Sequence, residues 1–226
     1  MIGDSSFRNF VSSAQRRLRR WAIGRGRSLE KLTVQQRRDL WPPAKRLQER
    51  HVRNCRLVEN RRRMLELLPK GAVCAEVGID QCRFSARIVE TTAPTRLHLI
   101  DIAQTSIARA RELFAREIAS GQVETHLGDS STLLRGFPDG YFNWIYIDGD
   151  HFYEGVRRDL EAARLKVAAG GLIALNDYVF FSSSDFCKYG VVEAVNEFCL
   201  EHDWEFVFFA LNTRMYNDVV LRKIVT

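Results

Sequence analysis

The chain has 226 residues, enough for one well-packed domain with an appendage but few for two independent domains. Although 46% of the residues are hydrophobic, no apolar run approaches the roughly 18 residues that span a bilayer, which argues against a membrane helix. The net charge of +6 is uneven, because residues 1–63 hold 18 basic and 5 acidic side chains whereas residues 64–226 hold 16 and 23. The basic character therefore belongs to the N-terminal segment.

The N-terminal residues and the cysteines both indicate the cellular compartment in which the protein is expected. The opening MIGDSSFRNF does not have the basic, apolar and small-residue succession of a secretory signal. The five cysteines are an odd number and none are spaced as CxxC, which indicates neither a disulfide framework nor a cysteine zinc site. We therefore expect a cytoplasmic protein with reduced thiols.

In residues 6–22, apolar side chains recur every three or four positions and the arginines lie mostly on the other faces. This pattern predicts a basic amphipathic helix, and two further helices are expected over about 28–40 and 44–68. We expect residues 1–63 to form a helical extension that acts as a lid, an oligomerisation segment that would make a homo-oligomer, or a surface-binding segment. Peripheral membrane contact through residues 6–22 is an alternative, because aromatic side chains lie on the apolar face. Nothing resembles a base-reading module, so a nucleic-acid partner is not expected.

From Ala72 onward, short apolar runs alternate with amphipathic helices, a pattern typical of a parallel sheet covered on both faces. The expected strands lie at about 72–78, 97–101, 122–127, 142–148 and 171–176, and the expected helices at about 83–91, 104–119, 130–135, 152–167 and 190–201. Two final apolar runs, 205–211 and 216–224, suit an antiparallel hairpin. Residues 64–226 are therefore predicted to form an α/β domain with a Rossmann-like, seven-stranded, mostly parallel sheet.

Acidic residues follow the first two predicted strands at a spacing that suits a nucleotide-like ligand. Glu76 precedes Gly78 at the end of the first strand, and Asp101 ends the second strand about 20 residues later, as an acid that binds ribose hydroxyls does. Gly78 would let the backbone approach a ligand closely. An NAD-dependent dehydrogenase would need further glycines for a pyrophosphate, where this chain has Asp80 and Cys82. The sequence therefore disfavours an oxidoreductase.

Oxygen-bearing side chains also follow the fourth and fifth predicted strands. Asp148 closes the fourth strand, and Asn176 and Asp177 close the fifth, so parallel pairing would bring all three to one crevice. Oxygen ligands favour Mg²⁺ or Ca²⁺ over softer metals. In the other interpretation, Asp148 contacts the cofactor or substrate directly and Asp177 caps a loop.

Three motifs carry a resemblance to a known family: AEVGIDQCRFS (75–85), YIDGDHFYE (146–154) and GGLIALNDY (170–178). With them, about 65–224 resembles the class I S-adenosylmethionine-dependent methyltransferases, in the branch with AEVGxxxGxFS and YIDGDHxYE motifs. Cys82 stands where that branch has glycine.

The resemblance implies S-adenosylmethionine as cofactor, with Glu76 and Gly78 at its methionine part, Asp101 at its ribose, and Asp129 with Ser130 at its adenine. In metal-dependent O-methyltransferases of the catechol and macrolide-sugar types, comparable ligands hold Mg²⁺, and the resemblance maps them onto Asp148, Asn176 and Asp177. His151 is placed like the base of the sugar enzymes, and an imidazole with an ordinary pKa near 6.5 could accept a proton at neutral pH.

These expectations predict methyl transfer to a small-molecule acceptor, at a hydroxyl, with catalytic roles for His151 and Asp148. Two alternatives stay open: a metal-independent methyltransferase acting on nitrogen, and a non-catalytic nucleotide-binding or membrane-associated module that works through the basic N-terminal helix. The sequence does not determine the acceptor, the need for Mg²⁺ or the oligomeric state.

Overall fold

A computed structural model describes residues 43–225 of the chain. The helices predicted over 6–22 and 28–40, and the membrane contact predicted for the first of them, lie outside the described residues. The described chain divides into two compact units, one of residues 45–179 and 190–225, and one that includes residues 180–189.

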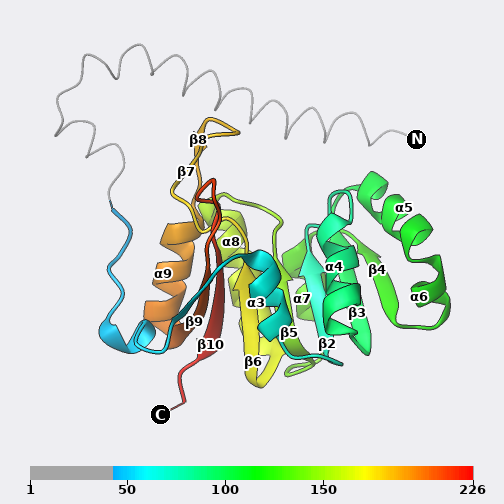
Figure 1. Cartoon of the computed structure of the whole chain (residues 1–226), viewed down its shortest axis with the longest axis horizontal. Helices are drawn as coiled ribbons and strands as arrows, with labels where there is room; N and C mark the ends of the chain where they lie inside the picture. The colour runs from blue at the N-terminus through cyan, green and yellow to red at the C-terminus, as the bar shows by residue number, and fades with distance from the viewer. Residues whose placement is uncertain (1–42, 226) are drawn as a thin grey trace. The chain divides into compact units, whose positions relative to one another are not determined.

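The larger unit is built on an eight-stranded sheet (Figure 1). In spatial order its strands are β1 (Arg56–Val58), β9 (Trp204–Ala210), β10 (Asp218–Lys223), β6 (Val167–Leu175), β5 (Phe142–Ile147), β2 (Val73–Val77), β3 (Arg96–Asp101) and β4 (Val123–Leu127). Neighbouring strands are parallel, except that β10 is antiparallel to both β6 and β9. The predicted α/β fold with a mostly parallel sheet and a C-terminal antiparallel hairpin is therefore confirmed, but the sheet has eight strands where seven were expected, because β1 joins its edge.

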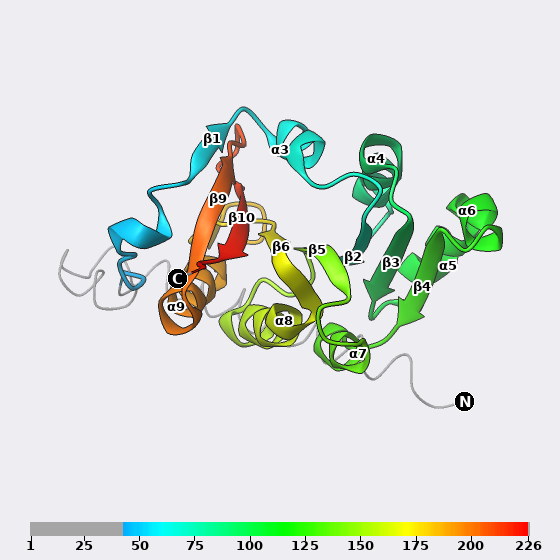
Figure 2. The same cartoon turned by 90° about the horizontal axis from the view of Figure 1, so that it is seen from below.

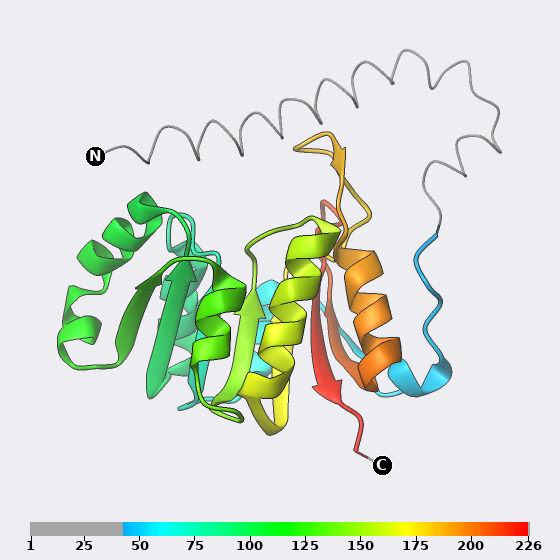
Figure 3. The same cartoon turned by 180° about the vertical axis from the view of Figure 1, so that it is seen from behind.

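Helices cover both faces of this sheet, as the alternating sequence pattern predicts. They are η1 (Glu49–His51), α3 (Arg61–Leu67), α4 (Arg83–Thr92), α5 (Gln104–Leu113), α6 (Ala115–Ala119), α7 (Ser130–Gly136), α8 (Tyr153–Lys166) and α9 (Val191–His202). Helices α3 and α4 lie on one face and α7, α8 and α9 on the other (Figures 2 and 3). With both faces covered, central strands such as β5 read as nearly continuous apolar runs.

The strand β5 contributes Trp144 and Tyr146 to the core, both fully buried against one face of the sheet. Burying a large apolar side chain of this kind contributes about 1.5–3 kcal/mol to folding. The indole of Trp144 still satisfies its N–H, which donates to the carbonyl of Pro69 at 3.1 Å. The core therefore fixes the carboxyl end of β5 without leaving this polar group unpaired.

The expectation of one continuous helix over 44–68 is wrong. Residues 56–58 form β1, which pairs in parallel with residues 208–210 of β9 at the sheet edge. The helix α3 begins only at Arg61, because the side chain of Asn60 caps it by accepting the backbone N–H of Arg63 at 2.9 Å. Pairing with a distant strand has overridden local helix propensity here.

Two smaller differences concern element boundaries. The helix expected over 104–119 is broken at Phe114, whose backbone leaves the helical region while its ring is buried, giving α5 and α6. The strand expected from 171 begins already at Val167, directly after α8.

Residues 180–189 carry a small antiparallel ladder of β7 (Phe181–Ser182) and β8 (Cys187–Lys188), which the sequence did not predict. The Tyr189 hydroxyl donates to the Asp185 carboxylate inside this unit. Within residues 43–225, no helix combines the length and the apolar composition that a bilayer crossing needs.

Candidate active site

The candidate site lies where the carboxyl ends of the parallel strands meet at one edge of the sheet (Figure 1). The strand order reverses at β2, which has β3 on one side and β5 on the other. The segments that follow β2 and its neighbour β5 lead to opposite sides of this point. Open α/β sheets bind ligands in the crevice that results. The predicted residues lie at these strand ends: Gly78 and Asp148 directly follow β2 and β5, and Asp101 is the last residue of β3.

Gly78 is required by the backbone at this point. Its φ of +80° lies in the region that favours glycine, and an added Cβ would meet the carbonyl oxygen of Asp148 at 2.1 Å. The N–H of Asp148 donates to the carbonyl of Val77 at 2.7 Å. A glycine here therefore allows the loops after β2 and β5 to run in contact.

Asp101 closes the loop that follows β2. Its carboxylate accepts the backbone N–H of Ile79 at 2.9 Å and the N–H of Ala103 at 2.7 Å. A carboxylate has room for about four hydrogen bonds, so these two contacts hold the group in place and leave further acceptor capacity. This geometry fits the predicted role of Asp101 toward ribose hydroxyls.

The departure from the family motif at Cys82 is accommodated by the backbone. Asp80 and Cys82 both adopt positive φ, 41° and 59°, and Cys82 is buried at the start of α4. Left-handed conformations cost non-glycine residues about 1–2 kcal/mol. The turn therefore keeps the conformation a glycine would favour, at some cost in stability.

Glu76 places a carboxylate beneath the same loop. It is 1% exposed, and its Oε2 has no hydrogen-bond partner among the described residues. Burial raises the pKa of this carboxyl to about 8, although Ser85 and Arg61 act in the opposite direction. A buried acceptor without a partner is costly, and a ligand that brings a donor would satisfy it. Glu76 thus fits the predicted place of the cofactor's methionine part.

Asp129 and Ser130 lie after β4, linked to this loop by the N–H of Gly128, which donates to the Asp101 carbonyl at 3.0 Å. Asp129 caps α7, accepting from Ser131 Oγ at 2.8 Å and from the Thr132 N–H at 2.9 Å. These bonds lower the pKa of Asp129. A capping role is thus established by the geometry, and the contact with adenine stays a prediction.

Ser130 turns toward a buried carboxylate. Its hydroxyl donates to Asp159 Oδ1 at 2.6 Å, and Asp159 is 2% exposed. Burial raises the pKa of Asp159 to about 6 even though this hydrogen bond lowers it. Sequence reasoning did not single out Asp159, because an aspartate inside an amphipathic helix is ordinarily on the solvated face.

The residues after β5 and β6 form one cluster, as predicted. Asn176 Nδ2 donates to Asp148 Oδ1 at 2.7 Å. The Nε2 atom of His151 lies 3.4 Å from Asp148 Oδ1 and 3.2 Å from Asp177 Oδ2. The loops after two adjacent strands thus place one imidazole between two carboxylates.

The charge of His151 differs from the sequence-based expectation. Burial lowers the pKa of its imidazole, but the carboxylates of Asp148 and Asp177 outweigh burial and raise the pKa to about 10. In this arrangement the imidazole is protonated at neutral pH. It therefore donates hydrogen bonds and cannot accept a proton from a substrate.

Arg61 enters the cluster from α3 and was not predicted. Its guanidinium donates to Asn176 Oδ1 and forms an ion pair with Asp218, from Nε to Oδ2 at 2.8 Å. It also stacks over the rings of Phe84 and Tyr146, with its central carbon 5.1 Å and 5.7 Å from their centroids. No signal in the sequence distinguishes Arg61 from the arginines that follow it; only the start of α3 at Asn60 aims it inward.

Asp218 completes the contacts of Arg61. It is 1% exposed, and the Tyr146 hydroxyl donates to its Oδ2 at 2.8 Å. Burial raises the pKa of Asp218 to about 7, while the Arg61 charge lowers it. The first residue of the antiparallel strand β10 thus belongs to the same edge of the sheet.

The donors expected for Mg²⁺ do not fit a resident metal in this arrangement. The carbonyl oxygen of Asn176 is held by Arg61, and the carboxylates of Asp148 and Asp177 face the His151 cation. A divalent ion would have to displace two protein cations from its own ligands, or lie beside them against charge repulsion. The two cations thus supply the positive charge that the metal was expected to bring.

Comparison with known proteins tests the resemblance to the methyltransferase family. Residues 77–178, the segment that carries this edge of the sheet, match the family model of a methyltransferase domain. A search among curated proteins gives no significant match.

Solved structures share the fold. A candidate rRNA methylase from Clostridium thermocellum superimposes with a TM-score of 0.57 at 15% identity, covering 74% of this chain and 99% of that one. TrmK of M. capricolum, in complex with the cofactor product S-adenosyl-homocysteine, gives a TM-score of 0.55 at 13% identity, covering 74% and 70%. The [4+2]-cyclase SpnF gives 0.54 at 16% identity, covering 73% and 82%.

At these identities the structural likeness shows the fold, and the same fold serves different acceptors and even a cyclase. The family match adds a methyltransferase domain over the segment that contains Gly78, Asp101 and Asp148. Taken together with the confirmed strand order, these findings show a methyltransferase domain over residues 77–178 and a Rossmann-like fold shared with solved methyltransferases.

Proposed function

We propose that the protein transfers the methyl group of S-adenosylmethionine to a hydroxyl of a small-molecule acceptor, at the cluster of Asp148, His151 and Asp177. The observation that carries the proposal is the imidazole held between two carboxylates beside the loop of Gly78. Such a cluster can orient a hydroxyl and take up its proton.

On the cofactor side, the supporting geometry is the loop after β2. The free Oε2 of Glu76 suits the ammonium of the methionine part, Asp101 suits the ribose hydroxyls, and Asp129 with Ser130 suits the adenine. The bound cofactor would supply a methyl group on a positively charged sulfur. The protein's contribution is to hold that methyl group in line with the acceptor oxygen.

On the acceptor side, we propose that Asp148 accepts the proton of the acceptor hydroxyl and that His151 has a positioning role. With a bound cofactor supplying the methyl group and leaving as its neutral thioether, the Asp148 carboxylate would take up the proton of the acceptor hydroxyl. The protonated His151 holds Asp148 and Asp177 in place, since it faces both. This assignment replaces the expectation of His151 as the base, because its raised pKa keeps it protonated at neutral pH.

No metal is used in this proposal, because Arg61 and His151 already pair with the expected ligands Asp148, Asn176 and Asp177. A chelator is therefore expected to leave turnover unchanged. Loss of turnover with chelator, restored by Mg²⁺, would contradict this part of the proposal and favour the metal-dependent type.

The first experiment is calorimetric titration of the purified chain with S-adenosylmethionine and, separately, with NAD, each with and without Mg²⁺. We expect micromolar binding of S-adenosylmethionine and none of NAD. In Asp101→Asn the affinity should fall about tenfold or more, since a charged acceptor is lost. Glu112→Gln, at an exposed pair with Arg109, is the matched control and should bind normally.

The acceptor is then tested by release of S-adenosyl-homocysteine over panels of hydroxyl compounds, amines and RNAs. Turnover confined to hydroxyl compounds supports the proposal. Turnover confined to amines or RNA would support methyl transfer but refute the proposed hydroxyl acceptor. Absence of cofactor binding in the first experiment would point to a non-catalytic module.

A further inference from the structure

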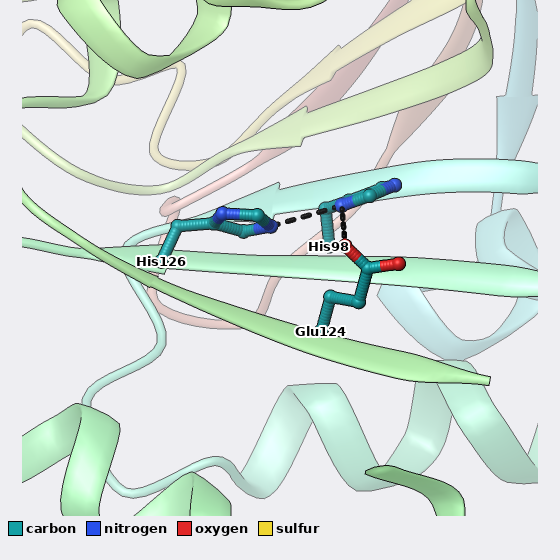
Figure 4. Close-up of side chains that lie close together, drawn as sticks. All are labelled: His98, Glu124 and His126. Atoms are coloured by element: carbon teal, nitrogen blue, oxygen red, sulfur yellow. Dashed lines mark hydrogen bonds and ion pairs between the residues drawn. The ribbon is translucent and has the colours of Figure 1, made fainter. Parts of the chain in front are cut away.

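Three side chains with metal-binding chemistry meet on the strands β3 and β4, away from the Asp148 cluster. His98 comes from β3, and Glu124 and His126 come from β4 (Figure 4). His98 Nδ1 lies 2.9 Å from His126 Nε2 and 3.6 Å from Glu124 Oε2. Figure 4 shows the Nδ1 atom of His98 facing both partners, so the three ligand atoms converge on one point.

The sheet register dictates this arrangement. His98 and Glu124 are directly paired across β3 and β4, and His126 lies two residues beyond Glu124 on the same face of β4. Directly paired residues have Cβ atoms about 5 Å apart, and diagonal neighbours such as His98 and His126 about 7–8 Å apart, which imidazole side chains can span. The convergence therefore follows from strand pairing, not from a flexible loop.

The surroundings fix the orientation of the buried imidazole. His98 is 2% exposed, and its Nε2 lies 3.1 Å from the Tyr141 hydroxyl, on the far side of the ring from Glu124 and His126. The rings of Phe137 and Phe142 pack edge-on against it, with centroids 4.8 Å and 5.5 Å away. Metal-binding histidines ordinarily have their second nitrogen held in this way by a polar partner, inside an apolar shell.

We propose that His98, Glu124 and His126 form a binding site for a divalent transition-metal ion of the Zn²⁺ class. With metal–ligand bonds of about 2.0–2.1 Å, the two separations correspond to angles of about 90° and about 120° at the ion, which bracket the tetrahedral angle. Two imidazoles and one carboxylate suit Zn²⁺ or Co²⁺ better than Mg²⁺, which prefers oxygen ligands. Glu124 is 41% exposed, so the fourth position is open to water.

A second histidine–carboxylate cluster away from the Asp148 cluster is a weaker candidate among the described residues. Glu161, Glu201 and His202 lie on α8 and α9, but Arg164 pairs with Glu161 at 2.7 Å and Arg157 pairs with Glu201 at 3.0 Å. In the His98 cluster only one carboxylate is paired in this way: Arg96 lies 3.3 Å from Glu124 Oε1, while Glu124 Oε2 faces His98 at 3.6 Å. A metal there would tie β3 to β4, whose carboxyl ends carry the cofactor residue Asp101 and the loop to Asp129.

The test uses the full chain, without an affinity tag, after removal of metal with chelator. Calorimetric titration with Zn²⁺ should show one site per chain, and Zn²⁺ should raise the midpoint of thermal unfolding. Co²⁺ should give a visible absorption band of a four-coordinate nitrogen and oxygen site, without the near-ultraviolet charge transfer of thiolate ligands.

Two variants remove ligands with little risk to the fold. Glu124→Gln keeps the shape of a half-exposed side chain, and His126→Asn keeps a polar group; each should weaken Zn²⁺ binding at least about tenfold. Tyr141→Phe, which removes the partner of His98, should weaken it by about 10- to 100-fold. His202→Gln and His151→Gln are the matched controls and should bind Zn²⁺ as the parent chain does.

No Zn²⁺ binding to the parent chain would overturn the proposal, leaving a hydrogen bond between two histidines as the role of the cluster. Binding that survives in both Glu124→Gln and His126→Asn, or that disappears only in a control variant, would overturn it as well. Because the readout is metal binding, the outcome does not depend on methyl transfer.

Discussion

At the scale of single residues, burial and neighbouring charges determine whether Glu76 and His151 are protonated. Glu76 is held in a place where its carboxyl remains protonated up to about pH 8, and His151 in one where it remains protonated to about pH 10. The two shifts differ in origin: burial raises the pKa of Glu76, whereas for His151 burial lowers the pKa and the carboxylates of Asp148 and Asp177 outweigh it. The residue types were visible in the sequence, whereas their protonation depends on neighbours from other strands.

Glu76 should destabilise the protein without cofactor as pH rises. Its folded pKa of about 8 lies above the ordinary value of 4.5, so the folded state holds a proton that the unfolded state releases between these values, and stability falls as pH rises through that window. We expect Glu76→Gln to be more stable than the parent at pH 8 by an amount of the order of 1–3 kcal/mol, with a smaller difference at pH 5. Denaturant unfolding at the two pH values measures this.

The same substitution should weaken S-adenosylmethionine binding, because glutamine has no carboxyl that could ionise against the ammonium of the cofactor. Glu90→Gln, on the exposed face of α4, is the control and should change neither quantity. Equal stability of Glu76→Gln and the parent at pH 8 would show that the carboxyl is ionised without cost.

His151 should titrate far above an ordinary histidine. Its raised pKa means that the interaction with Asp148 and Asp177 stabilises the fold fully below about pH 6.5 and is lost as pH rises through about 10. Nuclear magnetic resonance of the ring nitrogens should therefore show a protonated imidazole at pH 8. In Asp177→Asn the pKa should move down toward 6.5, and a parent imidazole already neutral at pH 8 would return His151 to the role of base.

At the scale of elements, the start of α3 decides whether Arg61 reaches the cluster. Asn60 ends the segment after β1 and caps the helix, so that Arg61 is its first residue. The contacts of Arg61 lie 115 positions away at Asn176 and 157 positions away at Asp218. A short helix with a defined start thus supplies the charge that the acceptor side was expected to obtain from a metal.

Asn60→Ala should lower the free energy of unfolding by about 0.5–2 kcal/mol, the cost of a lost helix cap. Asn60→Ser, which keeps a capping oxygen, should be close to the parent. Denaturant unfolding compares the three proteins. A parent-like Asn60→Ala would show that contacts of Arg61, not the cap, fix the start of α3.

At the scale of the whole molecule, residues 45–179 and 190–225 make up one compact unit with its own core and the complete sheet. A chain that begins at residue 43 is therefore expected to fold and to bind S-adenosylmethionine as the full chain does. Circular dichroism and calorimetry measure the two properties. Loss of folding would show that residues 1–42 contribute to the core.

If the shortened chain binds cofactor but no longer turns over an acceptor, the removed residues take part in acceptor recognition, as predicted for a lid. Unchanged turnover would instead favour the surface-binding or oligomerisation roles expected of the basic residues 1–63.

The sequence by itself determined the sheet, the C-terminal hairpin and the positions of Glu76, Gly78, Asp101 and Asp148 at strand ends. These depend on local signals: the period of apolar residues, the lengths of the runs and the glycine at a tight turn. Because parallel strands deliver their carboxyl ends to one edge, these signals also predicted the convergence of Asp148 with Asn176.

Only the tertiary structure decided the rest, because it arises from pairing between distant segments. Pairing of residues 56–58 with 208–210 converts a predicted helix into a strand. The inward position of Arg61 and the meeting of His98 with His126 likewise depend on which strands lie side by side. Burial and charge at such meeting points set the protonation of His151 and the fit for a metal, and no local pattern in the sequence records them.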